Sequence, residues 1–135
     1  MDRDLCKFAS DGNIQKVRHL LDKGANINFK SELLSGQREQ GRGSGSPPLL
    51  WAASKGHAHV VEELLHRGAD VETRNRLGST ALLCAAVGGH WHVVKLLMEH
   101  GGNPRVENLK GISPMTIARS AGRKDMADLI MTYKT

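Results

Sequence analysis

The chain has 135 residues, with 19 Lys and Arg against 14 Asp and Glu and a formal net charge of +5. This length suits one domain, and so moderate a charge does not indicate a histone-like or tail-type binder. Aromatic residues make up only 4% of the chain, which predicts thin, closely stacked layers and not one thick core. No apolar run approaches about 18 residues, which excludes a transmembrane helix, and the first residues lack the apolar segment of a signal peptide.

The two cysteines, Cys6 and Cys84, lie far apart in unrelated contexts. Two isolated cysteines predict neither a disulfide framework nor a cysteine-based zinc site. We therefore expect free thiols and a reducing compartment, the cytoplasm or the nucleus.

Three markers recur along the chain in one register. The turn that begins at Gly12 returns 44 residues later at Gly56 and then at intervals of 33 residues, at Gly89 and Gly122. A glycine followed by a small residue and Asn or Asp keeps this register at 24–26, 68–70 and 101–103. An apolar, Ala-rich run keeps it at 49–53, 82–86 and 115–118. Three markers in one register indicate an internal repeat of 33 residues.

The residue pattern of each repeat unit predicts two short helices. The first is rich in small residues, such as Ala52 and Ala53, which let neighbouring helices approach closely. The second carries apolar residues at Val60, Val61 and Leu64, a spacing that buries one helix face. Glycines 24, 68 and 101 end the second helices, where a left-handed residue is favoured. No unit can bury its apolar face alone, so the stability must come from stacking.

The period and its markers resemble ankyrin repeats, and the resemblance covers essentially the whole chain. It implies an all-α fold, an α-solenoid of about four stacked helix-turn-helix units with β-hairpin-like loops. In chain order, the units of this single domain, 1–135, fall at about 1–30, 42–74, 75–107 and 108–135. Charged residues on the first and last helices predict end units that face water on one side.

The largest departure from the family pattern is an insertion at about 31–41, within Lys30–Ser46. The Gly and Ser content of 41–46 predicts a mobile segment. The insertion is either part of a binding face or a tolerated surface loop.

Two smaller departures concern the helices and the last loop. The Thr-Pro-Leu-His segment of the family has lost its histidine to Leu50, Leu83 and Thr116, which predicts modest stability. Pro104 replaces the usual Val, which predicts that the last loop deviates.

Candidate metal and catalytic groups have structural alternatives. The pairs His57/His59 and His90/His92 are H-x-H motifs, but His57 and His90 occupy the usual Gly-His turn of the family, and no other ligand recurs beside them. Cys84 lies in an Ala-rich helix, where we expect a buried small hydrophobe. No phosphate loop, carboxylate pair or serine elbow is present. We therefore expect no metal, no cofactor and no enzymatic activity.

The resemblance implies a non-enzymatic protein-binding module, a small adaptor, scaffold or regulatory inhibitor, that uses its hairpin tips and concave first-helix face. Carried over by position, the protein-binding residues are Arg74, Arg76, Leu77, Ser79, Leu109, Lys110 and Ile112 in the hairpins, and Ser54, Lys55, Val87, Gly88 and Ser120 in the first helices. Asn28, which follows Leu20 by eight residues, resembles the asparagine that asparaginyl hydroxylases modify in this family.

The hairpin segments carry an excess of positive charge, in part from Arg38 and Arg42. Such an edge either complements an acidic protein surface or is an ordinary solvated edge. Nucleic acid is the alternative partner, although no aromatic residues interleave with the basic ones for base stacking. We expect a monomer that binds another protein and no membrane. Trp91 is either exposed in a turn or a packing residue, and Trp51 is predicted to lie in the core.

Overall fold

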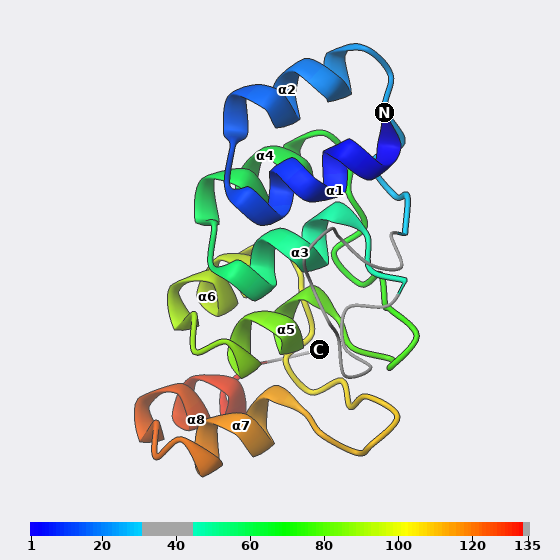
Figure 1. Ribbon diagram of the computed structural model, residues 1–135. Helices are drawn as coiled ribbons and strands as arrows, with labels where there is room; N and C mark the ends of the chain where they lie inside the picture. The colour runs from blue at the N-terminus through cyan, green and yellow to red at the C-terminus, as the bar shows by residue number, and fades with distance from the viewer. Residues whose placement is uncertain (31–44, 134–135) are drawn as a thin grey trace.

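The computed structural model describes residues 1–30 and 45–133, and the predicted insertion at 31–41 lies outside them. The described residues form eight helices in four antiparallel pairs (Figure 1). Their bounds are α1 Asp2–Asp11, α2 Ile14–Asp22, α3 Pro48–Lys55, α4 Ala58–His66, α5 Ala81–Val87, α6 Trp91–Glu99, α7 Pro114–Ser120 and α8 Lys124–Met131. The all-α repeat solenoid that the resemblance implies is therefore confirmed.

The first helix of each pair begins where the sequence supplies a start signal. Pro48 and Pro114 stand at the first positions of α3 and α7, where the missing N–H costs nothing. The Thr80 hydroxyl accepts a hydrogen bond from the Leu83 N–H and caps α5. Ser113 and Thr116 form a reciprocal capping box at α7. At α7, the residue that replaces the family histidine therefore makes a different local hydrogen bond.

The helices lie in two layers. The first helices pack side by side in the order α1, α3, α5 and α7, and α2, α4 and α6 form the second layer behind them (Figure 1). The small residues of the first layer, including Ala9, Ala53 and Ala86, are essentially inaccessible to solvent. Leu50 and Leu83, which replace two of the family histidines, are equally buried. Apolar packing thus occupies the positions of the absent hydrogen bonds.

Both tryptophans are buried. Trp51 packs against Cys6 and Phe29, and its Nε1 donates to the Ser46 carbonyl at 2.9 Å. The predicted core position of Trp51 is confirmed. Of the segment 41–46 that is predicted to be mobile, 41–44 lie outside the described residues, and Gly45 and Ser46 are buried. Trp91 is only 7% exposed and has the Arg123 guanidinium over its ring at 5.5 Å. Of the two alternatives for Trp91, packing is the one that the structure supports.

The last loop retains the turn of the preceding loop despite Pro104. Asn103 Oδ1 accepts from the Arg105 N–H at 2.9 Å, as Asp70 Oδ1 accepts from the Glu72 N–H at 2.9 Å. The deviation predicted for the last loop is therefore wrong at this turn. Within the described part of the chain, no helix combines the length and the hydropathy that crossing a bilayer requires.

Candidate functional site

The hairpin loops extend to one side of the helix stack (Figure 1). In the loops at 67–80 and 100–113, an asparagine side chain closes the tip. Asn75 Oδ1 accepts from the N–H groups of Leu77 and Ser79, at 3.0 and 3.1 Å. The Asn75 amide also donates to the Ser46 hydroxyl at 3.2 Å. One side chain therefore closes its own turn and ties it to the preceding loop.

The next hairpin repeats this closure 33 residues later. Asn108 Oδ1 accepts from Lys110 and Ile112, at 2.9 and 3.0 Å. Neither asparagine was among the predicted site residues, yet their shared register was visible in the sequence. Asn75 and Asn108 rank as positioning residues, because their side chains hold the tips in shape.

Successive hairpins are also joined to one another. The Leu109 N–H donates to the Leu77 carbonyl at 2.9 Å. The Leu109 side chain covers Gly78, where an added Cβ would lie 3.2 Å from Leu109 Cγ. Arg76 covers Gly45 in the same way, with Arg76 Cγ at 3.2 Å from such a Cβ. Each of these two tips thus rests on the preceding loop, and together they form a continuous edge.

We use the name hairpin edge for Arg74, Arg76, Leu77, Leu109, Lys110 and Ile112. Arg74, Arg76 and Lys110 are exposed, and Leu109 is 78% exposed. Leu77 and Ile112 are half-buried. Ser79 was predicted to contact a partner, but it is 7% exposed because it lies beneath the turn that Asn75 closes. Ser79 therefore supports the edge from within and offers little surface to a partner.

The first-helix residues form a second group. Ser54 and Lys55 end α3, Val87 ends α5, and Ser120 ends α7, with Gly88 next to Val87. All five are exposed, and Val87 is 63% exposed. The hairpins lead into the opposite ends of these helices, so a helix length of roughly 12 Å separates the two groups. The structure brings residues together within each group but not the two groups with each other.

The positive charge of the hairpins is only partly available to a partner. Arg105 Nη2 donates to the carbonyls of Met131 and Tyr133, both at 3.1 Å, at the end of α8. Arg74 and Lys110 remain at the surface, with Glu107 as an exposed acidic residue nearby in the sequence. Arg38 and Arg42 lie outside the described residues. Among the described residues, the hairpin edge therefore carries more positive than negative charge.

The turn histidines join neighbouring units. His57 Nε2 lies 2.9 Å from the Ser10 carbonyl, and its ring covers Gly12. The His90 ring covers Gly56 in the next interface. These contacts give both histidines a packing role. Within residues 1–30 and 45–133, no group of three His, Cys, Asp or Glu side chains is placed to hold a metal ion.

Two remaining candidates differ in their surroundings. Cys84 on α5 was expected to be fully buried, but the residue as a whole is half-buried and packs against the core. Burial of its sulfur nonetheless raises the pKa of the Cys84 thiol to about 12, so the thiol stays protonated at neutral pH and is a poor nucleophile. Asn28 is exposed, and its N–H donates to Asn26 Oδ1 at 3.0 Å.

Comparison with known proteins agrees with this architecture. A family model described as ankyrin repeats (3 copies) matches residues 5–75 and 49–135. The chain is 38% identical over 74 residues to human "Ankyrin repeat and KH domain-containing protein 1" and 40% identical over 74 residues to the Drosophila melanogaster "Ankyrin repeat and KH domain-containing protein mask". Each match covers 55% of this chain, but only 3% and 2% of the respective relatives.

Ankyrin repeats are in general protein–protein interaction modules and are typically non-enzymatic. The two matches of the family model together cover residues 5–135, which include parts of all four helix pairs of the structure. The chain therefore belongs to the ankyrin-repeat family.

Proposed function

We propose that this chain is a non-enzymatic adaptor, scaffold or regulatory inhibitor that binds a partner protein through the hairpin edge and the exposed ends of the first helices. The observation that carries the proposal is the joined hairpin edge. Its tips are fixed by Asn75 and Asn108 and linked by the hydrogen bond from Leu109 to Leu77. A surface fixed in this way loses little conformational entropy when a partner binds.

The partner surface that fits this edge is acidic with an apolar centre. Arg74, Arg76 and Lys110 supply exposed positive charge, and the exposed Leu109 and Val87 side chains supply apolar contact area. Opposite charge on the partner would speed encounter and fix orientation, and the apolar residues would contribute affinity. The two free cysteines fit a reducing compartment, so we place this binding in the cytoplasm or the nucleus.

A photocrosslinking experiment tests the site directly. A benzophenone amino acid is placed at Leu109 in one sample and at Lys95, on the second-helix layer, in another. Irradiation in native lysate is followed by mass spectrometry of the crosslinked proteins. The proposal expects a protein that crosslinks at position 109 and not at position 95.

A charge-reversal pair provides the matched control. Arg74→Glu/Lys110→Glu changes two exposed residues of the hairpin edge, and Lys16→Glu/Lys95→Glu makes the same change in net charge on the second helices. Circular dichroism checks that both variants keep their helices. The proposal expects the crosslink to be lost in the first variant alone, and equal crosslinking in both would refute it. Recovery of nucleic acid with salt-steep binding would support the alternative partner instead.

A further inference from the structure

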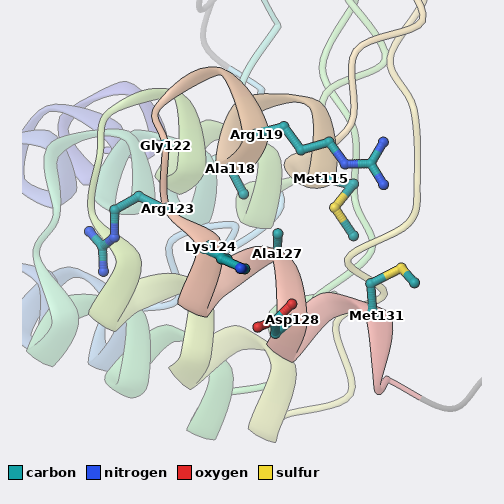
Figure 2. Close-up of a pocket in the computed structure, with 9 residues that line it drawn as sticks. All are labelled: Met115, Ala118, Arg119, Gly122, Arg123, Lys124, Ala127, Asp128 and Met131. Carbon is teal, nitrogen blue, oxygen red and sulfur yellow. The ribbon is translucent and has the colours of Figure 1, made fainter.

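A hollow of about 380 Å³ lies between α7 and α8, on the last described unit of the stack (Figure 2). Its lining residues are Met115, Ala118, Arg119, Gly122, Arg123, Lys124, Ala127, Asp128 and Met131. This size falls at the lower end of the range of ligand pockets, about 300–1,000 Å³. Met131 is 61% exposed, and Figure 2 shows Met115 and Met131 on the same side of the hollow.

The floor of the hollow corresponds to surface that other units bury. In the 33-residue register, Met115 matches Leu82, which is 1% exposed, and Ala127 matches Val94, which is 0% exposed. Both inner residues lie in the core between units, whereas Met115 and Ala127 are half-buried. The end of the stack thus retains an apolar floor that no described residue covers completely.

The rim of the hollow differs in its residues from the corresponding surface of the inner units. Arg119 stands where Ala86 and Ala53 allow close approach of neighbouring first helices. Lys124 stands where Trp91 is buried. A guanidinium at the small-residue position would hold a further first helix away from α7. A segment narrower than a helix pair fits such a rim.

Charge defines the chemistry of that occupant. Arg123 is already engaged, because its Nε and Nη2 both lie 3.1 Å from the Asp125 carboxylate. Within the described residues, the side chains of Arg119 and Lys124 form no ion pair or hydrogen bond. Asp128 is the opposing charge among the lining residues and lies beside Lys124 on α8 (Figure 2). Arg119 and Lys124 therefore stand beside the apolar floor without an ion pair among the described residues, and Asp128 is the opposing charge of the lining.

We propose that this hollow docks a short amphipathic peptide segment of another protein, in which carboxylates flank a Leu, Met or Phe side chain. The apolar side chain would lie between Met115 and Met131, whose flexible thioethers adapt to different shapes. The carboxylates would pair with Arg119 and Lys124 in charge-assisted hydrogen bonds. Asp128 would repel a further carboxylate of the peptide, so the peptide would bind in the orientation that keeps its carboxylates away from Asp128.

Methionine methyl NMR provides the test. The chain has five methionines, so a protein labelled with ¹³C at these methyl groups reports on Met115 and Met131, with the distant Met1 and the buried Met126 as internal references. The probe is a short synthetic peptide in which Glu residues flank a single Leu. The control peptide has Lys in place of every Glu. The proposal expects the Glu peptide alone to shift Met115 and Met131, with Met1 and Met126 unchanged.

Variants separate charge recognition from folding. We expect Arg119→Glu/Lys124→Glu to weaken binding of the Glu peptide about tenfold or more. The milder Arg119→Gln/Lys124→Gln variant serves if the first does not fold, and the hairpin variant Arg74→Glu/Lys110→Glu should bind normally. No binding of the Glu peptide, equal binding of both peptides, or no effect of the rim variants would overturn the proposal. Concentration-dependent shifts of Met115 and Met131 without peptide, together with a dimer in sedimentation, would also overturn it and assign the hollow to a second copy.

Discussion

At the scale of single residues, the shape of the hairpin edge depends on two amide side chains. Asn75 satisfies two backbone N–H groups of its own turn and also donates to the Ser46 hydroxyl, whereas Asn108 satisfies two N–H groups of the next turn. Both side chains accept hydrogen bonds from backbone N–H groups at a hairpin tip, where no neighbouring strand of the described chain supplies an acceptor. The binding surface is therefore set by residues that would themselves contribute little contact area.

We predict that Asn75→Ala lowers the free energy of unfolding by about 1–3 kcal/mol, because it leaves half-buried N–H groups without an acceptor. Asn108→Ala should cost less, because it removes a pair of local bonds without the additional link to a preceding loop. Urea unfolding followed by circular dichroism measures both. The exposed Asn28→Ala is the control. A cost at Asn75 no larger than that at Asn28 would contradict the role of Asn75 in closing the turn.

At the scale of helices, charged side chains connect the second-layer helices. Arg18 on α2 donates to Glu63 on α4 at 3.1 Å, and Arg67 pairs with Glu63 at 2.9 Å and with Asp22 on α2 at 2.8 Å. The Arg18 hydrogen bond, partly offset by burial and assisted by Arg67, holds the pKa of Glu63 below its ordinary value. Glu63 is the least exposed member of this group.

The lowered pKa of Glu63 predicts a pH dependence with a definite sign. The unfolded chain binds a proton at Glu63 more readily than the folded chain does, so stability rises with pH in this window. The contribution is complete above about pH 4.5 and is lost as the pH falls through the lowered folded pKa. Urea midpoints of wild type and Glu63→Gln at several acidic pH values test this. Their difference should shrink as the pH falls, and a constant difference would contradict it.

Glycine turns between the helices of a pair give a matched comparison of packing. Gly56 and Gly89 have nearly identical backbone angles, with φ of 78° and 77°. An added Cβ at Gly56 would lie 2.5 Å from His90 Nδ1, whereas at Gly89 nothing lies within 4 Å. The backbone cost of Ala in the left-handed region is common to both, about 1–2 kcal/mol.

We therefore predict that Gly56→Ala destabilises the protein by about 1–3 kcal/mol more than Gly89→Ala does, because the His90 ring must move. Thermal or urea unfolding of the two variants measures the difference. A second pair of variants, made in a His90→Ala background, should show nearly equal costs. Persistence of the difference without the ring would refute the packing explanation.

The helices could be predicted from sequence because their signals are local. Glycines at fixed intervals and the spacing of Val60, Val61 and Leu64 define helix ends and buried faces without knowledge of the rest of the fold. The burial of Ser79 and Trp91 could not be predicted in this way. Ser79 lies beneath a turn that the Asn75 side chain closes, and Trp91 is covered by Arg123 from the next unit. The hollow between α7 and α8 also depends on the absence of a covering neighbour among the described residues, which no local pattern encodes.

At the scale of the whole molecule, the interfaces between units are unequal. The contact between α1 and α3 is about as extensive as the contact between α3 and α5. The contact between α5 and α7 is smaller than either. Arg119 and Thr116 take the positions that Ala86 and Leu83 hold in the preceding unit, so the last unit has fewer small and apolar groups at its margins. In a linear stack, each unit depends on its neighbours alone. Among the described residues, the last unit is thus held by the smallest of the three first-layer contacts.

This inequality predicts the order of local opening. Hydrogen exchange followed by mass spectrometry should show amides of α7 and α8 exchanging before those of α3 and α5, because local opening of the last unit breaks one small interface. Arg123→Ala removes the contact with the Trp91 ring and the pair with Asp125, so it should accelerate exchange in α8 further and leave α3 unchanged. Simultaneous exchange of all four pairs would instead mean that the stack opens as one cooperative unit. A peptide bound in the hollow should slow exchange in α7 and α8, since a ligand that binds only the closed form stabilises that form.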